Sequence, residues 1–213
     1  RAALDAEFAR LGEVGAPDLP SELRRAKKRV ALLTGLADLG GVWSLEEVTG
    51  ALTNFADLSV QLSLRATLGA EVRRGKLPGM SLDDLETLGG MFVLSVGKMG
   101  AYELNYSSDI DLICLFDEAR FERDDFFEAR KAFIKATRGM SAMLNDRTAE
   151  GYVFRTDLRL RPDPAVTPVC MAVEAAERYY ESLGRTWERA AYIKARCGAG
   201  DQAAGEAFLE TLR

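Results

Sequence analysis

The stretch GGMFVLSVGKMGAYELNYSSDIDLICLFD, residues 89–117, decides the fold of this chain. It contains two short apolar runs, at 91–96 and 110–116, which lack helical periodicity and are bounded by turn and charge signals. Such runs are typical of strands that are buried on both faces. Asp109 and Asp111 stand where the second run begins. Burying charge there is costly unless something pairs with it, so these two acids need an explanation.

Asp109 and Asp111 are two residues apart, so on a strand their side chains project from the same face, roughly 6–7 Å apart at Cα. Two carboxylates this close repel, and each raises the pKa of the other unless a cation lies between them. Mg²⁺ prefers oxygen ligands and usually also binds substrate phosphates, so it suits such a pair. The alternative, for D-x-D taken alone, is a pair of acids that merely ends the strand in solvent.

The stretch YVFRTDLRLRP, residues 152–162, predicts a third strand whose two faces differ. One face would carry Phe154, Thr156, Leu158 and Leu160, and the other would carry Arg155, Asp157, Arg159 and Arg161. A solvated outer face would show the same pattern. If Asp157 instead faces Asp109 and Asp111, three carboxylates would bind two metal ions, and the arginines would neutralise phosphate oxygens.

The loop between the first two strands has the residues that an anion site needs. Gly97 and Gly100 let the backbone turn tightly and bring its N–H groups near an anion. The loop is a weak dinucleotide fingerprint, because Ser95 stands where GxGxxG requires its first glycine. It has no GK[ST] and therefore is not a P-loop. The apolar residues 113–115 exclude an EF-hand, which needs further oxygen ligands at these positions.

Composition narrows the chemistry that the chain can perform. The chain has 213 residues, 47% of them hydrophobic, and a net charge of −5, so no overall basic field attracts nucleic acid or an anionic membrane. It contains no histidine, which excludes Ser-His-Asp and Cys-His catalysis and His-ligated metals. Its three scattered cysteines argue against a disulfide framework or a zinc site and fit the reducing cytoplasm, where we expect the protein.

The remaining patterns predict an α+β fold with a helical first portion. Helices are expected from Ser21, the predicted N-cap, to about Gly75, with a break at Gly40-Gly41 and a capping box at Ser44. A helix of roughly 20 residues is expected between about Arg123 and Ala149. Further helices are expected at 173–183 and after the predicted cap Thr186, with Trp187 as a core or interface residue. We expect a helical portion at 1–80 and a sheet-containing domain at 81–213. Both ends are helical in pattern, as in a fragment of a longer protein.

Three separated motifs carry a family resemblance. They are GKMGAYELNYSSDIDL, FRTDLRLRP and GRTWERAAYIKAR, in this order. Val96-Gly97 followed by D-x-D and a later acid resembles the pattern of DNA-polymerase-β-like nucleotidyltransferases. The three motifs together resemble the bacterial glutamine synthetase adenylyltransferase/adenylyl-removing enzymes. The sequences SSDIDL and GRTWERAAYIKAR are more similar to the N-terminal, adenylyl-removing half of these enzymes than to the C-terminal, adenylylating half. The chain departs from that family at Ser95, usually Gly, and at Ala101, commonly Gly, so we expect an altered phosphate loop.

This resemblance implies that the chain removes AMP from a tyrosine of adenylylated glutamine synthetase, with orthophosphate as the attacking group and ADP as a product. It also implies a small mixed sheet and a requirement for Mg²⁺, as two ions bound by Asp109, Asp111 and Asp157. Gly97, Lys98 and Ser108, with Arg159 and Arg161 as weaker candidates, would bind the nucleotide or phosphate.

Two alternatives stay open at this point. The forward reaction, transfer of AMP from ATP to the same tyrosine, uses the same acids, so only the motif wording favours removal. A catalytically silent regulatory module of the same fold is the second alternative, and retention of all three acids weighs against it. The resemblance also implies glutamine synthetase as the protein substrate and the PII signalling protein as a partner, with no nucleic acid or membrane partner.

Overall fold

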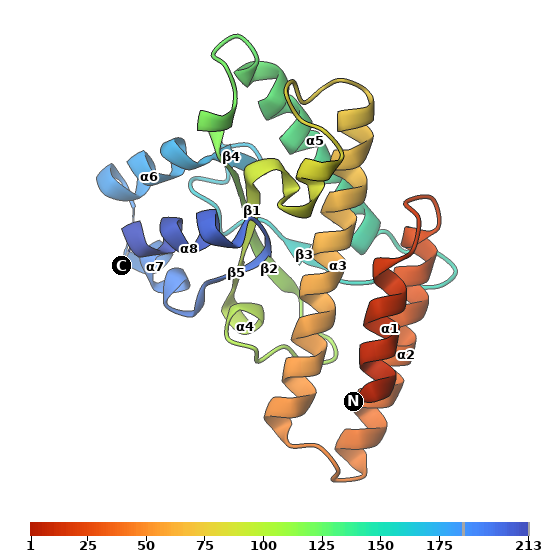
Figure 1. Cartoon of the computed structure of the whole chain (residues 1–213). Coiled ribbons are helices and arrows are strands. Elements are labelled where there is room, and N and C mark those ends of the chain that lie inside the picture. Colours follow the sequence, from red (N-terminus) through yellow and green to blue (C-terminus); the bar gives the residue numbers. More distant parts are fainter. Residues whose placement is uncertain (185, 213) are drawn as a thin grey trace.

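The computed structural model describes residues 1–184 and 186–212. The predicted cap side chain of Thr186 and the side chain of Trp187 lie outside the described residues. The helical first portion consists of α1 (Ala2–Gly12), α2 (Leu19–Leu39) and α3 (Leu45–Arg73). Figure 1 shows α1 and α2 side by side, next to the long α3.

Local signals account for most of these helix ends. Ser44 forms the predicted capping box, because its side chain accepts the Glu47 N–H and the Glu47 side chain accepts the Ser44 N–H. The predicted start of α2 at Ser21 is wrong, since the helix begins at Leu19 and Pro20 lies in its first turn. Proline fits there because N–H groups of the first turn have no partner within the helix. The helix ends at Leu39, where Gly40-Gly41 was expected to break it.

The second portion contains a small mixed sheet. Its strands are β1 (Met91–Val96), β2 (Ile110–Phe116), β3 (Thr156–Asp157), β4 (Cys170–Ala172) and β5 (Arg196–Gly200). The order is β3-β2-β1-β5, and β4 pairs with the later part of β2. β1 is antiparallel to β2 and β5, whereas β3 and β4 are parallel to β2. The predicted α+β class is confirmed.

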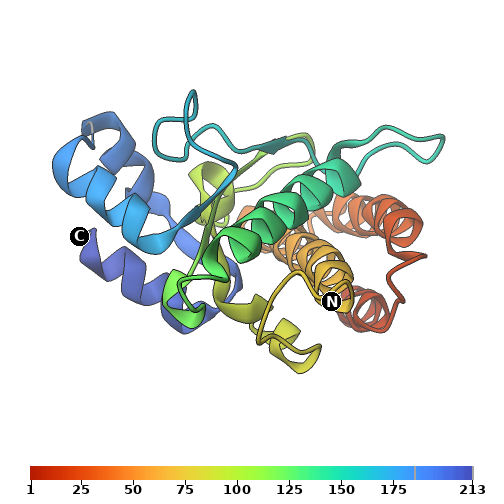
Figure 2. The ribbon, with the colours of Figure 1, turned by 90° about the horizontal axis from the view of Figure 1, so that it is seen from above.

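Helices cover both faces of the sheet. The helices of this portion are α4 (Gly97–Gly100), α5 (Phe126–Asn145), α6 (Val173–Ser182), α7 (Thr186–Ala191) and α8 (Gln202–Thr211), with short 3₁₀ turns at η1 (Asp83–Glu86), η2 (Leu88–Gly90), η3 (Glu118–Arg120) and η4 (Tyr192–Lys194). In Figure 2, α3 and α5 lie on one side of the sheet and α6 and α8 on the other. The first two strands are consequently buried on both faces, as expected.

The core therefore has two parts, one on each face of the sheet. Alternate side chains of β1 enter different parts, Met91 and Val93 beside α3 and α5, and Phe92 and Leu94 beside α6 and α8. Because the first part also contains side chains of α1 and α2, the helical portion packs directly on the sheet-containing portion. The division between residues 80 and 81 stays a prediction.

The strand expectations need correction at three places. The predicted strand at 152–162 is reduced to the two residues of β3, because the chain turns away after Asp157. β4 and β5 were not expected. The sequence of β5, RCGAG, is rich in glycine and lacks the β-branched residues that mark strands. No helix within residues 1–184 and 186–212 is both long enough and apolar enough to cross a membrane.

Candidate active site

Asp111 and Asp157 are neighbours on adjacent strands. The parallel register of β2 and β3 pairs Asp111 with Asp157 and Ile110 with Thr156. Ile110 enters the core beside α3 and α5, so strand alternation directs Asp111 and Asp157 to the opposite face. Burial, followed by the charges of Asp157 and Asp109, raises the pKa of Asp111 above its ordinary value. The three acids singled out in the sequence thus lie at one corner of the sheet.

Gly97 lies at the start of the segment that connects β1 to β2, and its backbone lies close to the side chain of Asp111. It begins α4 directly after β1 and has a positive φ of 60°. A Cβ atom at this position would lie 2.9 Å from Oδ2 of Asp111, which is closer than van der Waals contact allows. Both the left-handed conformation and the close approach therefore require glycine here.

Two arginines bind the outer two acids. Arg155 donates hydrogen bonds to Asp109 Oδ1 and, over 3.0 Å, to the Ser107 carbonyl oxygen. Arg159 Nε lies 3.0 Å from each carboxylate oxygen of Asp157. The hydrogen bond from Arg159 holds the pKa of Asp157 below its ordinary value. Because the Arg159 side chain is 82% exposed, releasing it from Asp157 costs little free energy.

The donor set fits a hard divalent cation. Three carboxylates without histidine offer the oxygen ligands that Mg²⁺ prefers, and Asp111 has no salt bridge within the described part of the chain. Among the described residues, no three acidic or cysteine side chains are gathered into a ready metal site. Arg155 and Arg159 supply positive charge to Asp109 and Asp157, so a cation shared by all three acids would compete with these arginines.

The residues expected on the phosphate side differ in their surroundings. Lys98 is exposed on α4. The Ser108 hydroxyl donates to Asn105 Oδ1 over 2.6 Å, which stabilises the turn before the acids. Arg161 donates to three carbonyl oxygens in the loop 158–167. Loop stabilisation accounts for Arg161, whereas the side chains of Lys98 and Arg159 are exposed to solvent.

A second ionic cluster contacts the segment between β1 and β2, at Met99 and Tyr102. Arg196 on β5 donates to Asp57 on α3 over 2.7 Å and to the Met99 carbonyl oxygen over 3.1 Å. Its guanidinium carbon also lies 4.0 Å from the ring centre of Tyr102. Ser95 donates to Asp57 over 3.4 Å. This cluster could not be predicted from the sequence, because Asp57 and Arg196 are 139 residues apart and no local pattern connects them.

Asp57 gives a testable pH dependence of stability. Burial raises its pKa from 3.8 to about 6, against the lowering effects of Arg196 and Ser95. The folded state therefore binds more protons than the unfolded state between these values. The contribution of Asp57 to stability is fully present below pH 3.8 and is lost as the pH rises through about 6. The loss amounts to about 3 kcal/mol.

Replacing Asp57 by asparagine should remove this contribution to the pH dependence. Urea unfolding of the wild type and of Asp57→Asn between pH 4 and 7 measures it. The difference in unfolding free energy between the two proteins should change most between about pH 4 and 6. A constant difference across the whole range would contradict the assignment.

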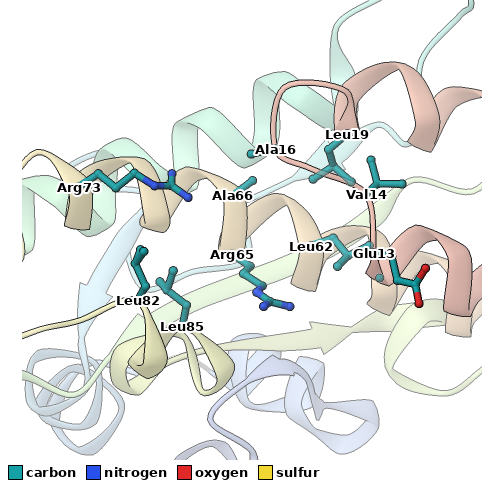
Figure 3. A pocket seen from close by; sticks show the side chains of 11 residues that line it. Glu13, Val14, Ala16, Leu19, Leu62, Arg65, Ala66, Arg73, Leu82 and Leu85 are labelled. Atoms are coloured by element: carbon teal, nitrogen blue, oxygen red, sulfur yellow. The ribbon is translucent and has the colours of Figure 1, made fainter.

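A cavity elsewhere in the molecule contains none of the three acids. It has a volume of about 340 Å³ and lies between α3, the loop after α1 and the segment around η1. In Figure 3, Arg65 and Arg73 extend from α3, Glu13 lies across the cavity, and Leu82 and Leu85 form another wall. The corner formed by β2 and β3 therefore stays the candidate site, because it is where the predicted acids meet.

Comparison with known proteins agrees with the motifs. The family described as glutamate-ammonia ligase adenylyltransferase matches residues 2–211. A protein of Bradyrhizobium sp. (strain ORS 278) is 54% identical over 198 residues, covering 93% of this chain and 20% of its own length. One of Bradyrhizobium diazoefficiens is 52% identical, covering 99% and 21%, and one of Caulobacter vibrioides is 47% identical, covering 90% and 19%.

All three relatives are named bifunctional glutamine synthetase adenylyltransferase/adenylyl-removing enzyme. The chain spans about a fifth of the length of these relatives. The match of the family to nearly the whole chain, together with the identities, establishes membership. The chain belongs to the glutamate-ammonia ligase adenylyltransferase family.

Proposed function

We propose that this chain carries the site that removes AMP from the adenylylated tyrosine of glutamine synthetase by Mg²⁺-dependent phosphorolysis. The observation that carries the proposal is the pairing of Asp111 with Asp157 beside Gly97. This arrangement combines carboxylates for a cation with a close-approaching backbone for a phosphate. The names of the relatives include both removal and addition of the adenylyl group, and the wording of SSDIDL favours removal.

The proposed reaction conserves atoms and charge without an additional reactant. An oxygen of orthophosphate forms a bond to the phosphorus of the tyrosine-linked AMP, and the bond from that phosphorus to the tyrosine oxygen breaks. The products are ADP and tyrosine, whose oxygen takes up the proton that the attacking phosphate gives up. Because this transfer depends on positioning and electrostatic stabilisation, it needs no histidine.

Each residue has a separate task in this proposal. Asp109, Asp111 and Asp157 would hold two Mg²⁺ ions, which when bound supply positive charge to the transferred group. The backbone at Gly97 would bind a phosphate oxygen by its N–H group. Arg159, once released from Asp157, is long and exposed enough to contact a substrate phosphate.

AMP transfer from ATP to the same tyrosine is the second candidate function, because the relatives are bifunctional by name. A binding module without activity is the third. We also propose a cytoplasmic location, since the substrates are a metabolic enzyme and free phosphate. Binding of the PII signalling protein is proposed from the family resemblance alone.

One assay separates these functions. The full-length polypeptide that contains this chain is incubated with adenylylated glutamine synthetase, phosphate and Mg²⁺, and ADP is measured. We expect ADP in proportion to the AMP lost from the protein. We expect no ADP when EDTA replaces Mg²⁺, and none when water replaces phosphate. Transfer of labelled AMP from ATP that depends on Asp111, without ADP formation, would favour the second function. If neither activity is found, the third function, a binding module without activity, is favoured.

A further inference from the structure

The strand that carries Asp157 has little support of its own. β3 has two residues and lies at the edge of the sheet, so β2 supports it on one side only. Nearby, the Ile110 N–H donates to the Arg155 carbonyl oxygen over 2.9 Å. Strands this short are not stable without further contacts. The direction of the Asp157 side chain therefore depends on what holds β3 from its other side.

The side chain of Asn145, the last residue of α5, provides that support. Its Oδ1 accepts the backbone N–H of Thr156 over 3.0 Å, and its Nδ2 donates to Thr156 Oγ1 over 2.7 Å. The hydroxyl of Ser141, one turn earlier on α5, lies 2.7 Å from the same Oγ1. One amide thus binds both the backbone and the side chain of Thr156, as a neighbouring strand would bind its backbone.

The end of α5 is itself firmly held. Arg24 on α2 is 3% exposed, and it donates to the carbonyl oxygens of Met143, Asp146 and Gly151 over 3.1, 2.6 and 2.9 Å. The Leu144 carbonyl oxygen accepts the N–H groups of residues 153 and 154. A buried arginine whose three side-chain nitrogens all donate to carbonyl groups restrains these groups strongly. The backbone on both sides of Asn145 is therefore restrained, so the Asn145 side chain can position β3.

We infer that Asn145 is a positioning residue for Asp157. Thr156 and Asp157 are consecutive, so on β3 their side chains point to opposite faces. Holding Thr156 toward α5 consequently directs Asp157 toward Asp111. This inference rests on the proposed function, because it assigns to Asn145 the orientation of one acid in the proposed metal site.

The test compares three variants of the full-length polypeptide. Asn145→Ala removes both hydrogen bonds to Thr156. Asn145→Asp keeps the acceptor for the Thr156 N–H, and the Thr156 hydroxyl can turn to donate to the new carboxylate. Arg138→Ala is the matched control, because Arg138 lines the same shallow cavity on α5 as Asn145 and has no hydrogen bond to β3 within the described residues.

Two measurements report on the site. Steady-state assays give kcat and KM for adenylylated glutamine synthetase, and electron paramagnetic resonance gives the affinity for Mn²⁺. Asn145→Ala should lower kcat and Mn²⁺ affinity about 10-fold or more, as removal of a group that orients a metal ligand typically does. Its KM should stay within about twofold, because bulk substrate binding is unchanged. Asn145→Asp should restore most of the loss, and Arg138→Ala should match the wild type.

The outcomes distinguish this inference from the proposed function. A folded Asn145→Ala variant with wild-type kcat and Mn²⁺ affinity would overturn the inference alone. A wild type that neither binds Mn²⁺ nor forms ADP would overturn both. If Asn145→Ala fails to fold, Thr156→Val carries the test. It removes the hydroxyl contacts and keeps the backbone bond, so a kcat and Mn²⁺ affinity equal to those of the wild type would then count against the inference.

Discussion

Replacing Asp111 by asparagine is expected to lower kcat for AMP removal by on the order of 10³-fold. Asp111 stands in register with Asp157, and its charge interacts with those of both other acids. Because the side chain of asparagine is a neutral amide, the substitution removes one of the three negatively charged ligands proposed for Mg²⁺. The assay for ADP described above measures the loss. A variant that keeps wild-type turnover would exclude Asp111 from the reaction.

The same substitution should not destabilise the protein. Burial and the charges of Asp157 and Asp109 raise the pKa of Asp111, so its ionised form is less favourable in the folded state than in the unfolded state. Asparagine has no such cost. In EDTA, Asp111→Asn should therefore melt at the wild-type temperature or above it. Loss of activity combined with a lower melting temperature would indicate a folding defect instead.

Asp117→Asn is the control for this experiment. Asp117 follows the other end of β2, and its side chain accepts the N–H of Ala119 at the start of η3. Asparagine keeps this acceptor, and the change removes one negative charge, as Asp111→Asn does. We expect turnover equal to that of the wild type, which would show that the effect of Asp111→Asn depends on position and not on net charge.

Replacing Gly100 by alanine is expected to lower the free energy of unfolding by about 3 kcal/mol, at the upper end of the cost of overpacking. A Cβ atom here would lie 2.6 Å from the carbonyl oxygen of Ser95 and still closer to that of Lys194. Both obstacles are backbone atoms, which cannot rotate away. The segment 192–196 would have to move away from α4, and the contact of Arg196 with the Met99 carbonyl oxygen would be lost.

Urea unfolding of Gly100→Ala and Gly50→Ala tests this prediction. Gly50 lies within α3, and a Cβ atom there would meet nothing within 4 Å. Alanine should therefore stabilise that helix by about 0.5–1 kcal/mol. The two identical substitutions should thus shift stability in opposite directions. Similar shifts would show that Gly100 does not have the close contacts described here.

The secondary structure was largely predictable where local pattern and local contacts agree. The apolar runs at 91–96 and 110–116 form β1 and β2 with the predicted bounds, and Ser44 caps α3 as its spacing with Glu47 predicts. The helix of roughly 20 residues that was expected between about 123 and 149 forms as α5, which has 20 residues, from 126 to 145. In each case the signal lies within one element, where side-chain periodicity follows directly from backbone geometry.

β5, in contrast, could not be predicted from its own residues. Gly198 suits its position because a Cβ atom would lie 2.8 Å from Asp57 Oδ1 and still closer to Ser95 Oγ. Small residues are thus needed in a strand that lies against α3, although glycine disfavours strands in general. The reason for the residue lies in two other elements, and so the sequence of β5 alone does not indicate a strand.

The sequence by itself determined the chemical types at the site: two acids on one strand face, a third acid among arginines, a flexible glycine and no histidine. Only the tertiary structure decided that Asp157 lies beside Asp111, that Arg155 and Arg159 bind the outer acids, and that Asn145 supports β3. Periodicity reports which face of an element a side chain occupies. The register between elements instead depends on contacts between residues far apart in the chain, for which a single sequence has no local signal.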